Sequence, residues 1–267
     1  SVVELETPAS TPRDGSRTTG FKTVLVVRVV ASDTKTTATK EKLADEWFGT
    51  GTDEVNLRSQ YRQCSYGKVV FNPAPDQPEI GIKNGVVTVE IDLKLRASAV
   101  DDMVIQNKVH MALKEKIGDK YKYDYDHTAF CFPRAKRKWK AFSYVGGRIS
   151  VFDDDICLAV SFQMHEIGHN LGLRHSGIIG NEYGDESCNM GYSVSKDSFN
   201  RCFNAPKSWF LGWYADRHRS LNPLKTPNFL GRLVGLSQYR KTVSRDYIIV
   251  KIIGSNNNDI YVSLNTA

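Results

Sequence analysis

Short apolar runs and amphipathic segments alternate along the chain. Residues 24–30 are almost entirely apolar, rich in β-branched side chains and preceded by a glycine, which predicts a buried strand. Residues 87–93 alternate apolar and polar side chains with the period of two that is typical of a half-buried strand. Further strands are predicted at 68–71, 127–132 and 141–152.

Helices are predicted between these strands. One helix over 38–48 ends at Gly49, and a second begins at the acidic stretch 52–54 and runs to about Cys64. Residues 97–117 contain neither proline nor glycine, which predicts a third helix. The apolar positions that recur near helical spacing in this segment are Val100, Met103, Val104, Met111 and Leu113.

An acidic triplet of Asp153, Asp154 and Asp155 stands directly before the apolar segment 156–171, which predicts a fourth helix. The triplet has two interpretations: it caps this helix and interacts with its dipole, or it binds calcium. Adjacent aspartates alone do not define a calcium loop, so Ca²⁺ has no further support in the sequence.

Strands mixed with helices indicate an α+β core. We expect a flexible lead-in over 1–20, rich in Pro, Gly, Ser and Thr, and a main domain over 21–215. A small β-rich subdomain is expected over 216–267, where strands at 247–253 and 260–264 flank an Asn-rich turn.

Composition adds exclusions rather than a function. The 267 residues are 40% hydrophobic and 25% charged, which excludes a disordered or fibrous chain. No apolar run approaches the roughly 20 residues of a membrane helix. The formal net charge is +6, and residues 216–267 carry +5 of it through eight Lys/Arg against three Asp. Basicity is therefore mainly a property of the C-terminal part, and we expect neither a nucleic acid nor a membrane as partner.

The segment from His165 to His175 carries the candidate chemistry. His165 and His169 are four residues apart, so a helix places both imidazoles on one face, where they can share one Zn²⁺. Glu166 follows the first ligand, and its carboxylate can take a proton from water at the metal. Gly172 permits a positive φ, which lets the helix stop and the chain turn so that His175 becomes the third ligand. Three protein ligands leave one position open, as in catalytic zinc sites.

This extended pattern resembles that of the metzincin zinc peptidases. The resemblance implies a catalytic domain with a twisted mixed sheet, an active-site helix, a methionine-containing turn (the Met-turn) and a C-terminal helix. The stretch 188–192 fits that turn and makes Met190 its methionine. In some metzincins a tyrosine two residues later ligates the metal or supports the oxyanion, and Tyr192 stands at this offset. The alternative is that Tyr192 simply packs in the turn.

Further motifs are similar to those of the gametolysin family, secreted zinc endopeptidases first known for digesting algal cell-wall glycoproteins. These motifs are Gln63-Cys64-Ser65-Tyr66-Gly67-Lys68, Gln163-Met164, Tyr183-Gly184-Asp185 and Cys202-Phe203-Asn204-Ala205-Pro206-Lys207-Ser208-Trp209. The resemblance implies a secreted, extracellular, monomeric zinc endopeptidase that hydrolyses proteins, matrix glycoproteins included. The alternative is a catalytically silent matrix-binding protein on the same scaffold, against which the intact Glu166 and three histidines speak.

Two features depend on this extracellular interpretation. Of the five cysteines, we expect the disulfides Cys131–Cys157 and Cys188–Cys202, with Cys64 left over, although sequence alone does not fix connectivity. The basic run 134–140, interrupted by a tryptophan, precedes the predicted edge strand, which in metzincins pairs with extended substrate. This run is either an exosite for acidic or sulfated matrix material or a solvated loop.

Overall fold

The computed structural model describes residues 18–96, 100–119, 121–135, 137–192, 201–255 and 258–264. Residues 1–17 of the predicted lead-in lie outside this set. Two compact units are present. The larger unit contains Gly20–Arg174, and the smaller unit contains His175–Tyr192 and the residues from Cys202 onward.

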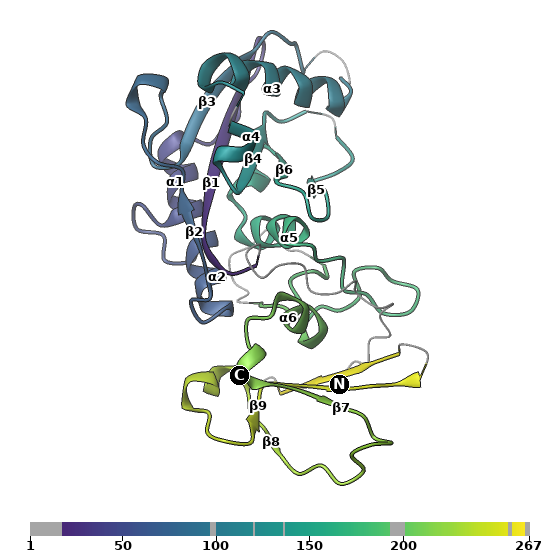
Figure 1. Ribbon diagram of the computed structural model, residues 1–267. Helices are drawn as coiled ribbons and strands as arrows, with labels where there is room; N and C mark the ends of the chain where they lie inside the picture. Colours follow the sequence, from purple (N-terminus) through teal and green to yellow (C-terminus); the bar gives the residue numbers. More distant parts are fainter. Residues whose placement is uncertain are drawn as a thin grey trace. The chain divides into compact units, whose positions relative to one another are not determined.

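The larger unit is built on a mixed six-stranded sheet (Figure 1). The order is β2-β1-β4-β6-β5, and β3 also pairs with β1. Its strands are β1 (Gly20–Ala31), β2 (Val69–Pro73), β3 (Val86–Ile91), β4 (His127–Phe132), β5 (Ala141–Ser143) and β6 (Ile149–Asp153). The first half of β1 pairs with β2 and its second half with β3, all in parallel. Strand β5 pairs antiparallel with β6 and forms an edge of the sheet.

The predicted strand over 141–152 is therefore wrong in extent, because it is a hairpin of two strands. The turn between β5 and β6 contains Gly146, which has a φ of 72°, a value that glycine adopts without steric cost. Gly147 then donates its N–H to the carbonyl of Tyr144 at 2.8 Å. The two adjacent glycines are a hairpin signal within an otherwise strand-like pattern.

In the described residues of the larger unit, five α-helices accompany the sheet: α1 (Lys40–Phe48), α2 (Leu57–Cys64), α3 (Asp102–Ile117), α4 (Tyr121–Asp124) and α5 (Val160–Asn170). Short 3₁₀ turns occupy Pro78–Ile80 and Asp154–Leu158. Helix α1 ends where predicted, at Gly49 in the left-handed conformation. Helix α2 begins later than predicted, because Asn56 and Ser59 form a reciprocal capping box that replaces the acidic stretch 52–54 as the start.

Helix α3 buries only part of the apolar set predicted for it. Met103, Val104 and Met111 are 53%, 44% and 64% exposed. Leu113 is buried as predicted, but its buried neighbours are Ile105 and Val109, which recur with it every four residues and belong to the apolar core. The apolar residues of the segment thus exceeded what one helical face can bury.

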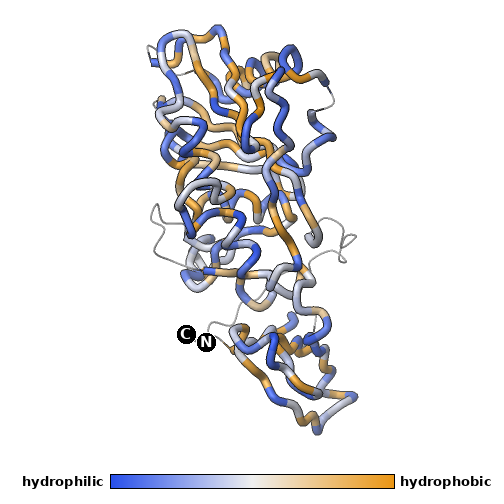
Figure 2. Tube along the Cα trace, turned by 90° about the vertical axis from the view of Figure 1, so that its left-hand side faces the viewer, coloured by the Kyte–Doolittle hydropathy of each residue, from blue (hydrophilic) through white to orange (hydrophobic). Residues whose placement is uncertain are grey.

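The core of the larger unit follows its parallel strands. Val24, Leu25, Val26, Val27 and Val29 of β1 are fully buried, because a central parallel strand is covered on both faces. Figure 2 shows hydrophobic residues gathered along these strands. The predicted mixed α+β class is confirmed, and the sheet supports helix α5, which carries the candidate site.

The part of the smaller unit that the structure describes combines one α-helix with short strands. Its elements are α6 (Ala205–Leu211), β7 (His218–Leu221), β8 (Arg232–Leu233), β9 (Asp246–Tyr247), β10 (Ile249–Ile252) and β11 (Ile260–Ser263), with 3₁₀ turns at Ala215–Arg217 and Leu236–Lys241. The strands form the sheets β11-β10-β7 and β8-β9. Trp209 of α6 stacks on His218 with ring centroids 4.4 Å apart and contacts Tyr261 edge-on, which fixes the helix on one sheet. Among the described residues, no helix combines the length and the apolar character needed to span a bilayer.

Candidate metal centre

Helix α5 presents the first two histidines and Glu166 from a buried position. His165, Glu166 and His169 are 5%, 4% and 7% exposed. The helix ends directly after this motif, because Gly172 adopts a φ of 100°, a backbone conformation that side-chain-bearing residues rarely take. The N–H of Leu173 then returns to the carbonyl of Gly168 at 3.0 Å. The chain therefore turns at the position that the sequence pattern requires.

Three histidines offer ring nitrogens that converge. Among the described residues, His165, His169 and His175 are the group whose potential ligand atoms fit a metal ion, all within 4.8 Å of one another. Zn²⁺ binds imidazole nitrogen at about 2.0–2.1 Å, and three such ligands leave a fourth position for water or substrate. The donor set therefore fits a catalytic zinc ion.

Hydrogen bonds at Nδ1 define how two of these imidazoles can bind. Nδ1 of His169 lies 2.9 Å from the carbonyl oxygen of Leu173. A carbonyl only accepts, so Nδ1 carries the proton and Nε2 is left with its lone pair for a metal. Nδ1 of His175 contacts the carboxylate of Glu182, which has the same consequence. The ring of His175 also packs on Tyr183, with centroids 4.2 Å apart.

Glu166 has the environment of a proton acceptor. Burial raises the pKa of its carboxyl to about 8. Its Oε2 atom is buried and has no hydrogen-bond partner among the described residues. A buried carboxylate oxygen without a protein partner is costly unless a water or a substrate group completes its hydrogen bonds. The carboxyl is thus placed to hydrogen-bond a water molecule or a substrate group.

Met190 is fully buried in the smaller unit and is tied to the segment of the third histidine. The N–H of Ser176, which follows His175, donates to the carbonyl oxygen of Met190 at 2.8 Å. Tyr192, two residues later, is 63% exposed, and its N–H donates to the carbonyl of Tyr183 at 3.0 Å. The roles predicted for Met190 and Tyr192 stay predictions.

The cysteines correct one predicted pairing. Cys131 and Cys157 form a disulfide, as predicted, with Cα atoms 5.7 Å apart. Cys188, however, is a buried free thiol, and both Cys64 and Cys202 are disulfide-bonded. The predicted Cys188–Cys202 bridge and the unpaired Cys64 are therefore wrong.

The Cys188 sulfur is a buried hydrogen-bond acceptor. The Sγ atom accepts hydrogen bonds from the Ser176 hydroxyl at 3.1 Å and from the N–H groups of Asn204 at 3.3 Å and Met190 at 3.4 Å. The other four of the five cysteines are disulfide-bonded, so no partner cysteine is left for this sulfur. Burial raises the pKa of this thiol, which keeps it protonated.

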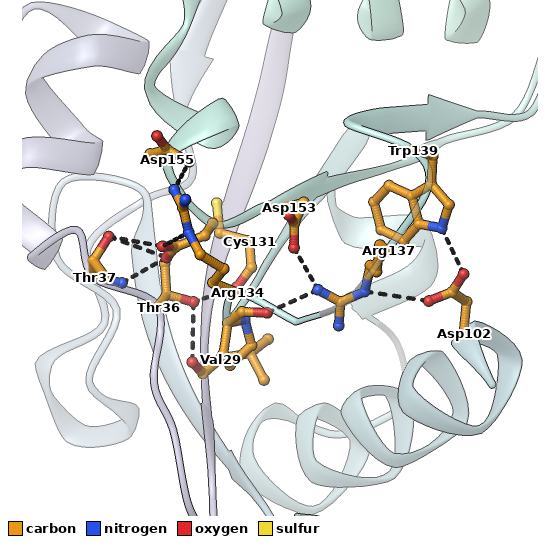
Figure 3. A network of polar contacts seen from close by, with 12 residues as sticks. Val29, Thr36, Thr37, Asp102, Cys131, Arg134, Arg137, Trp139, Asp153 and Asp155 are labelled. Carbon is orange, nitrogen blue, oxygen red and sulfur yellow. Dashed lines mark hydrogen bonds and ion pairs between the residues drawn. The ribbon is translucent and has the colours of Figure 1, made fainter. Parts of the chain in front are cut away.

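The acidic triplet neither caps helix α5 nor stands free for calcium. Asp153 makes no side-chain capping bond, and the residue before α5 is Ala159. Asp154 accepts from the N–H of Thr37 at 2.7 Å and from its hydroxyl, and Asp155 pairs with Arg134 (Figure 3). The capping interpretation is therefore wrong, because helix α5 begins after Ala159 and has no side-chain cap. Protein cations and donors hold the three carboxylates instead.

The basic run is partly buried rather than solvated. The Arg137 side chain is only 4% exposed and contacts Asp153 at 2.5 Å and Asp102 at 3.3 Å. The indole N–H of Trp139 donates to the same Asp102 carboxylate at 2.6 Å, which joins the segment before β5 to helix α3 (Figure 3). Lys138 and Lys140 stay exposed, and Lys136 lies outside the described residues. The interpretation as a solvated loop is therefore incomplete, because Arg137 is buried and paired, and the interpretation as an exosite stays a prediction.

Two site contacts have no counterpart in the sequence motif: the Leu173 carbonyl on His169 and the Glu182 carboxylate on His175. Leu173 contributes only its backbone, so no residue type could reveal it. Glu182 belongs to a loop, and its approach depends on the tertiary fold.

Solved structures resemble the chain at low identity. One is described as the structure of a chaperone-substrate complex, with 18% identity, a TM-score of 0.33, and coverage of 70% of this chain and 29% of that one. Another is archaemetzincin from Archaeoglobus fulgidus, complexed with malonate, with 14% identity, a TM-score of 0.32, and coverage of 70% of this chain and 99% of that one. No curated protein gives a significant match.

A family model covers most of the chain. The model described as Gametolysin peptidase M11 matches residues 23–257, a range that contains the three histidines, Glu166 and Met190. The resemblance inferred from the sequence motifs is thereby confirmed. The protein accordingly belongs to the gametolysin family and is a metallopeptidase.

Proposed function

We propose that the protein is a secreted zinc endopeptidase in which His165, His169 and His175 hold one Zn²⁺ and Glu166 is the general base. The observation that carries this proposal is the convergence of three imidazoles within 4.8 Å. The proton-bearing Nδ1 positions of His169 and His175 add support, because they leave Nε2 as the ligand atom.

The chain's own residues supply the proton chemistry. Bound zinc would polarise the scissile carbonyl and make water a better nucleophile. Glu166 takes the proton of the attacking water and then delivers it to the leaving amine. The charge of a bound zinc ion would favour the ionised form of this buried carboxylate, which is the form that accepts the proton. Tyr192 supports the oxyanion in this proposal, and Met190 forms the Met-turn.

The cysteines support the proposed secretion. The Cys131–Cys157 disulfide, together with the bonded Cys64 and Cys202, is compatible with an oxidising compartment. We take proteins, including matrix glycoproteins, as substrates of a monomeric enzyme. Residues 21–215 would form its catalytic domain and 216–267 a stabilising subdomain. A silent matrix-binding protein is the alternative, and the buried Glu166 beside the histidines disfavours it.

The decisive variant is Glu166→Gln, which keeps the shape of the side chain and removes its basicity. It should lose essentially all casein hydrolysis while retaining zinc, and a chelator should abolish the activity of the unmodified protein. Comparable hydrolysis by Glu166→Gln would refute the mechanism. A zinc-free but active protein would refute the metal assignment.

A further inference from the structure

A row of polar side chains connects the end of helix α5 to the sheet. The Ser143 hydroxyl lies 2.8 Å from the Ser150 hydroxyl, which donates to Oδ1 of Asn170 at 3.0 Å. Nδ1 of His127 lies 3.4 Å from the same amide oxygen. Ser150, Asn170 and His127 are 0%, 3% and 5% exposed, so water does not compete for these bonds.

Asn170 joins the metal-binding helix to the β5–β6 hairpin. It follows His169, and its Nδ2 donates to the carbonyls of Ile149 at 3.3 Å and Tyr144 at 3.4 Å. The N–H of Gly146, in the hairpin turn, donates to the carbonyl of His169 at 2.7 Å. The last turn of α5 is thus fixed to both strands of the hairpin.

Ser143 ends this row on the edge strand. It lies on β5, and its hydroxyl donates to Ser150, because the single proton of Ser150 goes to the Asn170 amide oxygen. Two hydrogen bonds in series therefore connect strand β5 to helix α5, the helix that carries Glu166.

We propose that Ser150 and Asn170 are positioning residues of the peptidase, which act through Ser143 to hold edge strand β5 and the helix that carries Glu166 in one fixed arrangement. The inference rests on the proposed role of Glu166 as general base. A displacement of about 1 Å at a reacting group can cost on the order of a hundredfold in rate, so a rigid link between helix and strand has a catalytic consequence. A row that served stability alone would change the unfolding temperature without changing turnover.

The test compares Ser150→Ala and Ser143→Ala with Ser65→Ala as a matched control. Ser65 is also 0% exposed and accepts from the N–H of Val69 at 3.1 Å, so its loss removes an equally buried hydroxyl from the turn between α2 and β2. With a quenched peptide substrate, each of the two test variants should lose about tenfold in kcat. KM should change less than about twofold and zinc content should be unchanged, since no substrate or metal contact is removed.

A double-mutant cycle tests whether Ser143 and Ser150 act through the same row of hydrogen bonds. If both residues act along one row, Ser143→Ala/Ser150→Ala should be no slower than the slower single variant. Ser143→Thr, which restores the hydroxyl, should recover most of the Ser143→Ala loss. Because Ser143 lies on a half-buried edge strand, this pair of variants stays informative even where Ser150→Ala folds poorly.

The inference is overturned by multiplicative losses in the double variant, by an equal kcat loss in Ser65→Ala, or by Ser143→Thr as slow as Ser143→Ala. Measuring Glu166→Gln in parallel distinguishes a failure of the proposed function from a failure of the positioning role. An active Glu166→Gln protein removes the proposed function itself. An inactive Glu166→Gln beside a fully active Ser150→Ala removes only the positioning role.

Discussion

The carboxylate of Glu182 contacts Nδ1 of His175, seven residues earlier in the chain. A carboxylate on the outer nitrogen of a metal-binding histidine fixes the ring and raises the basicity of the other nitrogen. Glu182 is 69% exposed at its side chain, so its effect comes from orientation rather than from a buried charge pair.

Replacement of Glu182 by Gln should therefore weaken zinc binding by about tenfold, the lower end of the range for such partners. Competition with a chromogenic chelator measures this affinity. Glu115→Gln, an exposed charge removal on helix α3, is the control and should leave zinc affinity unchanged. Equal zinc affinities of Glu182→Gln and the unmodified protein would show that the contact does not tune the metal site.

Arg137 carries a stability prediction. Its side chain is 4% exposed between Asp153 and Asp102, so Arg137→Met would leave two carboxylates without their cation. Breaking a buried ion pair on one side costs about 3–5 kcal/mol of the free energy of unfolding. Lys138→Met, at the exposed neighbouring position, should stay within about 0.5 kcal/mol. Urea unfolding of both variants decides the matter, and equal midpoints would contradict the structural role of Arg137.

The free thiol provides a direct check of the corrected cysteine pairing. Cys188 is buried and its thiol pKa is raised by burial, so the native protein should react with no thiol reagent. Denaturation without a reductant should expose one thiol per chain, and peptide mapping should assign the label to Cys188. A label on Cys64 would instead restore the pairing predicted from sequence.

The sequence predicted those features of the site that depend on residues close together in the chain. His165, His169 and Gly172 were predictable because helix periodicity and one backbone conformation fix their geometry. Glu182 was not, because its contact depends on how a loop folds back. The disulfide partners of the five cysteines likewise depend on tertiary proximity, which spacing along the chain does not encode.

The fold likewise combines features that a local sequence signal predicts with features that only tertiary packing determines. Strand β1 and the end of α1 at Gly49 were predictable from an apolar run and a terminating glycine. The face through which α3 packs was not, because several apolar residues compete along the segment and the sheet selects Ile105 and Val109. The turn at Gly146 was present in the sequence as a hairpin signal but was outweighed by the apolar pattern around it.

His127 makes the larger unit sensitive to acid. Its ring is 5% exposed, and burial lowers the pKa of the imidazole to about 4, with Lys22 and Arg148 lowering it further while Asn170 and Asp126 oppose the shift. In the unfolded chain a histidine titrates near pH 6.5. Between these two values the unfolded state binds a proton that the folded state does not, so stability falls as the pH is lowered.

The loss should begin as the pH falls below about 6.5 and reach about 3 kcal/mol near pH 4, with no contribution from this residue above pH 7. His127→Gln cannot take up the proton and still offers an amide N–H towards Asn170. This variant should be less stable than the unmodified protein at pH 7.5, but its free energy of unfolding should decline less steeply between pH 6.5 and 4. Urea unfolding at a series of pH values measures both slopes. Carboxylates and His218 contribute equally to the two proteins. If the free energy of unfolding declined equally steeply in both between pH 6.5 and 4, protonation of His127 would not be the cause of the decline.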